Sequence, residues 1–160
     1  MRRARAEEPI RRAGASDADA VARLLRDFNA EYDDPVPPQE EMADRIRALL
    51  GSGDTVILVA GEPACAVSVM RFRPGLWSPK LECYLAELYV VPGRRGQGIG
   101  RALMEESMAV ARAEGAGTME LGTGEDDVAA RALYESLGFT NLEHSAGGVD
   151  TLSLFYERDL

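Results

Sequence analysis

A loop rich in glycine and arginine follows an apolar run and precedes a segment with helical periodicity. The apolar run is Leu88-Tyr89-Val90-Val91, and the loop is Pro92-Gly93-Arg94-Arg95-Gly96-Gln97-Gly98-Ile99-Gly100-Arg101. Because glycine has no Cβ, successive backbone N–H groups of such a loop can point inward. The start of a helix adds the positive end of its dipole. The segment therefore predicts an anion cradle suited to a phosphate or pyrophosphate.

The spacing of this loop excludes the two common nucleotide motifs. A P-loop needs Gly-Lys-Ser or Gly-Lys-Thr, and the only lysine of the chain is Lys80. The dinucleotide motif needs a third glycine, but Arg101 stands three residues after Gly98 and Leu103 three after Gly100. The alternative is that the glycines only form a tight turn between strand and helix, which rarely requires three of them flanked by arginines.

Two motifs of the chain resemble the GNAT superfamily of acyl-CoA-dependent N-acyltransferases. Arg95-Gly96-Gln97-Gly98-Ile99-Gly100 is similar to its signature [Q/R]-x-x-G-x-[G/A], and Ala130-Arg131-Ala132-Leu133-Tyr134-Glu135-Ser136-Leu137-Gly138-Phe139 is similar to its A-x-x-L-Y-x-x-x-G-F motif. The second motif begins 35 residues after the first (130 − 95), as in the family. The resemblance covers residues 9–158.

The resemblance implies acetyl-CoA as co-substrate and no metal. It implies that the loop amides hold the pyrophosphate of coenzyme A, and the residues concerned are Arg95, Gly96, Gln97, Gly98, Ile99, Gly100 and Arg101. It also implies that the preceding strand is splayed from its neighbour. The N–H of Leu88 would then face the thioester carbonyl, and Val90 would pair with the pantetheine arm. A fixed N–H of this kind stabilises a developing oxyanion.

The resemblance makes Tyr134 the general acid that protonates the departing thiolate. The alternative is a core aromatic, because Tyr134 shares a helix face with Ala130 and Leu137. The family commonly has a carboxylate base near the central strand, and Glu87 is the first candidate and Glu82 the second. For Glu87, a strand edge or an open cleft is the competing explanation.

Two further residues are assigned to coenzyme A by their positions around this motif. Asp127 stands seven residues before Tyr134, where the family often has an asparagine that contacts the cofactor. An ionised aspartate repels phosphate and cannot donate a hydrogen bond, so Asp127 is alternatively a helix cap. Arg131 is assigned to the 3′-phosphate from its charge and position.

An acidic segment predicts the acceptor side. Residues 31–44 contain no Lys or Arg but six acids, namely Glu31, Asp33, Asp34, Glu40, Glu41 and Asp44. In the family the connection between the first two helices borders the acceptor, so Glu31 and Asp34 are the predicted substrate-binding residues for a cationic amine. Polyamines, amino sugars, small amines and peptide N-termini all remain candidates. The alternative is that these acids only form a solvated face of an acidic protein.

These residues must be positioned by an α+β fold of mixed, mostly antiparallel sheet with helices on both faces, in the order β-α-α-β-β-β-α-β-α-β-β. Residues 1–8 are expected to form a flexible tail and residues 9–160 a single GNAT domain. The expected helices are 18–29, 39–50, 98–114 and one that runs from Asp126 or Asp127 to Leu137. The expected strands are 9–13, 55–60, 64–72, 81–91, 118–123, 139–145 and 151–157.

Composition excludes several classes of protein. The 160 residues contain 18 Lys and Arg against 27 Asp and Glu, a net charge of −9, which disfavours nucleic acid as a partner. No window approaches the roughly 18 uninterrupted apolar residues of a membrane helix, and the N-terminus lacks the apolar part of a secretory signal. Two cysteines and one histidine fit neither a disulfide framework nor a zinc site. A cytoplasmic protein without a metal or membrane partner is expected, with a homodimer left open.

Two alternative functions keep the same loop. An acyl-CoA-binding regulatory domain without catalysis would need neither Tyr134 nor a base, so the presence of both favours an enzyme. An N-acyltransferase that uses succinyl-CoA or a longer acyl-CoA would differ in the pocket beside Leu88.

Overall fold

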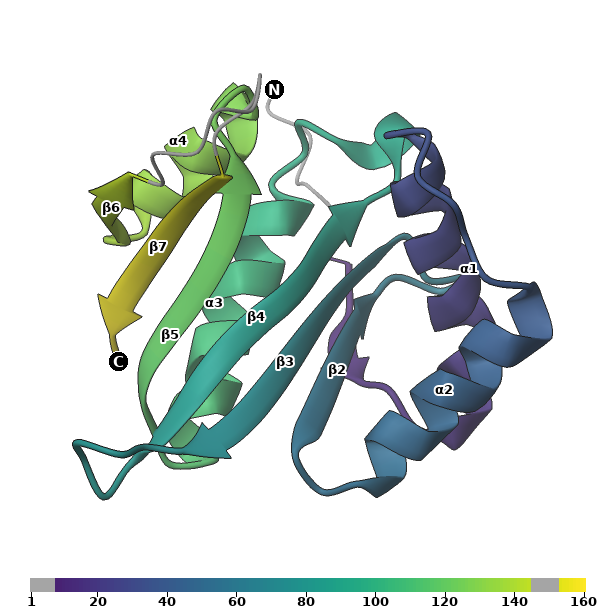
Figure 1. The fold of residues 1–160 in the computed structure, drawn as a ribbon. Coiled ribbons are helices and arrows are strands. Elements are labelled where there is room, and N and C mark those ends of the chain that lie inside the picture. Colours follow the sequence, from purple (N-terminus) through teal and green to yellow (C-terminus); the bar gives the residue numbers. More distant parts are fainter. Residues whose placement is uncertain (1–7, 145–152) are drawn as a thin grey trace. The chain divides into compact units, whose positions relative to one another are not determined.

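The strands and helices of the chain follow the predicted order (Figure 1). The computed structural model describes residues 8–144 and 153–160. The strands are β1 (Ile10–Arg12), β2 (Thr55–Ala60), β3 (Ala66–Pro74), β4 (Leu81–Val90), β5 (Ala116–Gly124), β6 (Thr140–His144) and β7 (Ser153–Asp159). The helices are α1 (Ala18–Ala30), α2 (Gln39–Gly51), α3 (Ile99–Ala113) and α4 (Val128–Ser136), with 3-10 turns η1 (Ala15–Asp17) and η2 (Pro92–Arg94).

The sheet is mixed, as the sequence predicts. Its strand order is β1-β2-β3-β4-β5-β7-β6. The pairs β1·β2, β2·β3, β5·β7 and β6·β7 are antiparallel, and β4·β5 is parallel. The predicted α+β class with a mostly antiparallel sheet is therefore confirmed.

Several strand boundaries differ from the prediction. β3 begins at Ala66 rather than at residue 64, because the turn after β2 extends to Cys65, whose N–H donates to the Ala60 carbonyl at 2.8 Å. β5 begins two residues earlier than predicted, at Ala116. The last strand runs from Ser153 to Asp159, and the predicted Gly147-Gly148 loop lies outside the described residues.

Contacts divide the described chain into two compact units. The first contains the residues up to Arg71 together with Glu87–Ser107, and the second contains Phe72–Ala86 and the residues from Met108 onward. Strands β3 and β4 and helix α3 each contribute to both units. The predicted single domain stays a prediction.

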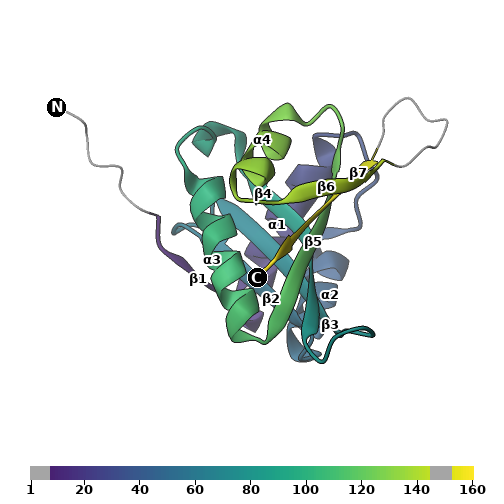
Figure 2. The same cartoon turned by 90° about the vertical axis from the view of Figure 1, so that its left-hand side faces the viewer.

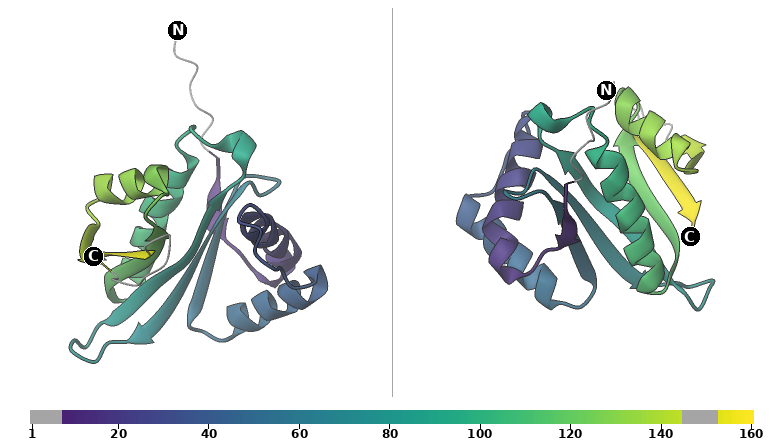
Figure 3. Two further views of the ribbon diagram at one scale, coloured as in Figure 1. Left: turned by 45° about the horizontal axis from the view of Figure 1, so that its top comes forward. Right: turned by 180° about the vertical axis from the view of Figure 1, so that it is seen from behind.

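In the first unit, helices cover both faces of the β2–β3 hairpin (Figure 3). Ile57 of β2 points toward Leu50 of α2, and successive side chains of a strand alternate between its faces. On the other face, the buried Ser68 of β3 shares a 2.8 Å hydrogen bond with Ser107 of α3. Apolar side chains from these elements are buried around them, including Val21, Leu24, Ile46, Val59, Val67, Val69, Leu103 and Met104. The contact between Ser68 and Ser107 places the first part of α3 against the β2–β3 hairpin.

In the second unit, β5 pairs on both of its edges (Figure 2). Its parallel register with β4 runs from Leu81↔Ala116 to Tyr84↔Glu120, and its antiparallel register with β7 runs along the length of both strands. Arg73 of β3 binds Glu82 at 2.6 Å and Glu120 at 2.8 Å. The fully buried Tyr156 of β7 packs its ring against that of Tyr134 on α4. This contact positions α4 on its own unit.

Candidate active site

The glycine-rich loop has the backbone conformation that an anion cradle requires. Gly96 and Gly98 have φ angles of 74° and 86°, in the left-handed region that favours glycine. The first backbone hydrogen bond of α3 runs from the Ala102 N–H to the Gly98 carbonyl at 3.0 Å. Amides before Ala102 lie at the helix start, where they have no partner within the helix. No acidic residue lies in the first turn of α3, so no carboxylate of that turn repels an anion at the helix start.

The direction of the β4 amides follows from one hydrogen bond. The Val91 N–H donates to the Cys65 carbonyl, just before β3, at 2.9 Å. Successive residues of a strand direct their N–H groups to opposite edges. The amides of Leu88 and Val90 therefore point to the edge away from β3. The pairing of β4 with β5 ends at Tyr84, before both of these residues in the chain. The contacts of Leu88 and Val90 with acetyl-CoA stay a prediction.

Two arginines of the loop, Arg94 and Arg95, direct their side chains back onto the first unit. Arg94 forms an ion pair with Glu8 and donates to the Gln97 side chain at 3.3 Å. Arg95 binds Glu31 at 2.9 Å and donates to the Val90 carbonyl at 2.9 Å. The guanidinium of Arg95 already binds Glu31 and the Val90 carbonyl. The prediction that Arg95 binds pyrophosphate therefore rests on its backbone amide.

The two candidate bases lie in different surroundings. Glu87 is half-buried, and burial raises the pKa of its carboxyl above the ordinary value. Glu82 instead binds Arg73, so its carboxylate already has a charged partner. The role of base stays a prediction, and Glu87 has the setting expected of a proton acceptor.

The acidic segment divides into paired and exposed carboxylates. Glu41 forms an ion pair with Arg45, and Asp44 binds Arg47 at 2.9 Å. Asp33 and Asp34 are exposed beyond the end of α1, and Asp33 has a φ of 56°. Since Glu31 binds Arg95, Asp33 and Asp34 are the acids of this connection best able to attract a cation.

Tyr134 lies in the second unit near the end of α4. It is only 6% exposed, with its ring centroid 6.0 Å from that of Phe139 and 6.1 Å from that of Tyr156. Burial among aromatic rings holds the phenol in one place, which suits both a core aromatic and a positioned acid. The acid role stays a prediction.

The residues around Tyr134 have identified protein partners. Asp127 caps α4, its Oδ1 accepting from the Ala130 N–H at 3.1 Å, as the alternative for this residue predicts. Arg131 donates from Nε to the Tyr156 hydroxyl at 3.1 Å and from Nη1 to the Glu125 carbonyl at 2.9 Å. The assignments of Asp127 and Arg131 to coenzyme A stay predictions.

Two tyrosines in these networks carried no sequence signal. Tyr89 donates to Glu31 at 3.2 Å, and Tyr156 donates to Glu135 at 2.9 Å. Both lie within apolar strand patterns, where a tyrosine is ordinarily a core residue. Only the tertiary contact shows that their hydroxyls join polar networks.

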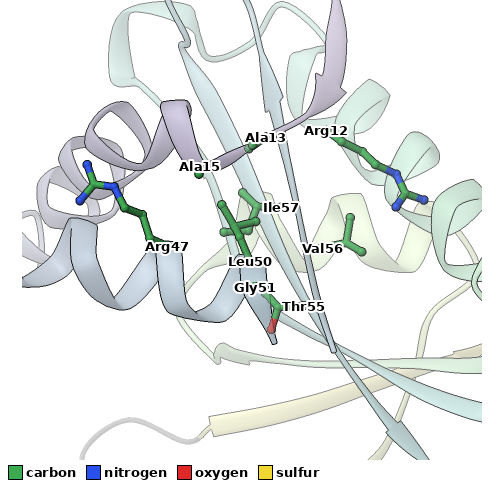
Figure 4. Close-up of a pocket in the computed structure, with 10 residues that line it drawn as sticks. Arg12, Ala13, Ala15, Arg47, Leu50, Gly51, Thr55, Val56 and Ile57 are labelled. Carbon is green, nitrogen blue, oxygen red and sulfur yellow. The ribbon is translucent and has the colours of Figure 1, made fainter. Parts of the chain in front are cut away.

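A cavity of about 340 Å³ lies in the first unit, and none of its lining residues is a predicted site residue (Figure 4). It is lined by residues of β1, α2 and β2 and of the η1 turn. Arg12 and Arg47 point away from each other, and Arg47 binds Asp44 and Asp19. These cations do not converge on one ligand, so the cavity is not the candidate active site.

Three further features of the described residues concern metal binding, membrane spans and thiols. Across 8–144 and 153–160, no group of three or more His, Cys, Asp or Glu side chains is arranged to hold a metal ion. Within the same ranges, no helix has the length and hydropathy needed to span a membrane. Cys65 and Cys83 are buried free thiols, and burial raises the pKa of Cys83 to about 12.

Comparisons with known proteins agree on one family. Residues 19–139 match the acetyltransferase (GNAT) family. The chain is 31% identical over 132 residues to YhfO, an uncharacterised N-acetyltransferase of Bacillus subtilis, covering 81% of this chain and 88% of that protein. It is 28% identical over 151 residues to the thialysine N-epsilon-acetyltransferase of Bos taurus, covering 86% and 87%.

A solved structure gives the same result. A protein from Arthrobacter sp. FB24, described as an acetyltransferase, superimposes with a TM-score of 0.79 at 41% identity, covering 92% of this chain and 94% of that one. The glycine loop, the fold and these relatives agree, and the chain belongs to the GNAT family as an acyl-CoA-dependent N-acetyltransferase.

Proposed function

We propose that this protein transfers the acetyl group of acetyl-CoA directly onto a primary amine of a small molecule or peptide. The observation that carries the proposal is the loop with left-handed Gly96 and Gly98 at the start of α3, a backbone conformation that suits an anion cradle. Direct transfer is supported by the two described cysteines. Both are buried, and a thiol whose pKa is raised to about 12, as at Cys83, is a poor acyl carrier at neutral pH.

The proposed mechanism uses one base, one backbone donor and one acid. Glu87 accepts a proton from the substrate ammonium, directly or through a water molecule, and the freed amine attacks the thioester carbonyl carbon. The Leu88 N–H donates to the oxygen that becomes negative as the new C–N bond forms. The C–S bond then breaks, and Tyr134 gives its proton to the departing thiolate. The nitrogen, which still carries two protons, loses one of them through solvent to the Tyr134 phenolate, and Glu87 releases its proton to solvent. The products are an N-acetyl amine and free coenzyme A.

The test is an acceptor screen that follows thiol release from acetyl-CoA. Polyamines, amino sugars, small amines and peptide N-termini are supplied in turn, with acetyl-CoA alone as the blank. Thiol release that depends on one amine class and is matched by an N-acetyl product supports the proposal. Binding of acetyl-CoA without thiol release for any amine would favour the regulatory domain, and turnover only with succinyl-CoA or a longer acyl-CoA would change the donor.

A cationic acceptor is part of the proposal. The exposed Asp33 and Asp34 support it, because their negative charges attract a cationic substrate through long-range electrostatics. The bovine relative is named for acetylation of an Nε amine of thialysine, which is consistent with this acceptor class.

Neutralising Asp33 and Asp34 together to asparagine is expected to lower kcat/KM for the amine about three- to tenfold and to flatten its dependence on salt. The KM for acetyl-CoA should stay within about twofold of wild type, because the amides of the loop are unchanged. Steady-state kinetics over a range of ionic strength measures both. An equal loss for the two substrates would contradict steering and indicate damage to the fold.

The raised pKa of Glu87 predicts the pH dependence of the reaction. A base acts only when it is deprotonated, so kcat/KM should rise as pH rises through the pKa of Glu87, which burial places above the ordinary value. Glu87→Gln should lose at least tenfold in kcat/KM together with this limb of the profile. A pH–rate profile whose acidic limb persists unchanged in the variant would assign the limb to another group.

A further inference from the structure

A cluster of three side chains in the first unit connects the end of α1 with the end of β4 and the start of the loop. In this Glu31 cluster, Nη2 of Arg95 lies 3.0 and 2.9 Å from the two carboxylate oxygens of Glu31. The hydroxyl of Tyr89 donates to Oε1 of Glu31 at 3.2 Å. The Arg95 guanidinium lies 5.6 Å from the Tyr89 ring centroid, within cation–π range. Each member therefore contacts both of the others.

Aromatic packing holds the cluster in place. Tyr89 is only 4% exposed, and its ring stacks on Phe28 of α1 with centroids 5.1 Å apart. Phe28 in turn meets Tyr32 edge to face at 5.7 Å. Burial, followed by the charge of Glu31, raises the pKa of Tyr89, so its hydroxyl remains a donor to the carboxylate. The carboxylate of Glu31 is thus fixed relative to β4.

Arg95 joins this fixed carboxylate to the backbone that is proposed to bind the co-substrate. Its Nε donates to the Val90 carbonyl at 2.9 Å, and the carbonyl and N–H of one strand residue point to the same edge. Gly96, the first left-handed glycine of the loop, follows directly in the chain. The side chain of Arg95 therefore spans the junction between the strand amides and the loop amides.

We propose that Glu31 is a positioning residue for coenzyme A, acting through Arg95, rather than a ligand of the acceptor amine. The inference rests on the proposed function, because it assigns the loop and Val90 to coenzyme A. Glu31 holds the Arg95 guanidinium on the Val90 carbonyl, which keeps the loop in the conformation that presents its amides. Both oxygens of Glu31 are engaged by Arg95, and one also by Tyr89, so its negative charge is already compensated within the protein.

The sign of one measurement distinguishes positioning from electrostatics. Removing a negative charge near a phosphate site should by itself tighten coenzyme A binding. Losing the position of Arg95 should weaken it. We expect Glu31→Gln to raise the Kd for coenzyme A about fivefold by calorimetry, the size expected for a partly exposed charged pair that also carries hydrogen bonds. At saturating acetyl-CoA, kcat should stay within about twofold of wild type, because Glu31 takes no part in the chemistry.

Two further variants complete the test. Glu41→Gln breaks an exposed Glu–Arg pair of the same chemistry on α2, and should leave the Kd unchanged. Arg95→Gln should weaken binding by itself, and adding Glu31→Gln to it should cause no further loss, because the two residues act as one unit. Circular dichroism and thermal melts confirm that each variant is folded.

Several outcomes would overturn the inference. These are an unchanged or tighter Kd in folded Glu31→Gln, additive losses in the double variant, or a loss confined to kcat/KM for the amine. The last result would assign Glu31 to the acceptor. Failure of the wild-type protein to bind coenzyme A would instead refute the proposed function, so the two failures are distinguishable.

Discussion

Replacing Tyr134 with phenylalanine is expected to lower kcat by at least tenfold, and by as much as 10²–10⁴-fold, the usual contribution of a general acid. The substitution removes one hydroxyl and keeps the ring contacts with Phe139 and Tyr156, so the α4 packing should survive. Folding and coenzyme A affinity should stay near wild type. Single-turnover kinetics, where chemistry limits the rate, measures the effect directly.

Two controls make this prediction specific. Tyr84→Phe removes the hydroxyl of an exposed tyrosine of the same unit and should leave kcat unchanged. The loss in Tyr134→Phe should shrink with an acyl donor whose thiol is more acidic, because a better leaving group needs less protonation. A kcat within about twofold of wild type would mean that Tyr134 only fills the core.

Replacing Gly98 with aspartate is expected to weaken coenzyme A binding by on the order of 10²–10³-fold, because it places a carboxylate where the pyrophosphate is proposed to lie. The fold should persist. Aspartate at the start of a helix is favourable, which offsets part of the strain of a side chain at a φ of 86°. Calorimetric titration with coenzyme A and a thermal melt measure the two effects.

The charge and the strain can be separated by two matched variants. Gly98→Asn has nearly the same shape and backbone strain as the aspartate, so its binding loss should be much smaller. Gly115→Asp makes the same change at another glycine with positive φ, at the far end of α3, and should leave coenzyme A binding unaltered. A Gly98→Asp variant that binds coenzyme A normally would show that the pyrophosphate lies elsewhere.

Local sequence determined most of the fold, because its signals act between near neighbours. The apolar positions of 18–30 and 99–113 recur at helical spacing, and both segments are helices. The left-handed Gly96 and Gly98 follow from the motif itself, since only glycine adopts these angles at little cost. The predicted first residues of the strands were less accurate. The turn between β2 and β3 ends at Cys65 through a hydrogen bond to Ala60, which the residue pattern does not encode.

Side-chain partners depended on tertiary structure. The sequence by itself predicted Glu31 as a ligand of the acceptor, Glu82 as the second candidate base and Arg95 as part of the loop that binds coenzyme A. It could not pair Glu31 with Arg95, 64 residues away, or with Tyr89, 58 residues away. Nor could it pair Glu82, its second candidate base, with Arg73. A charged side chain takes the partner that folding brings within a few ångströms, and strand order and register decide that partner. The sequence determined the family and the loop, whereas the tertiary structure decided which carboxylates are already neutralised.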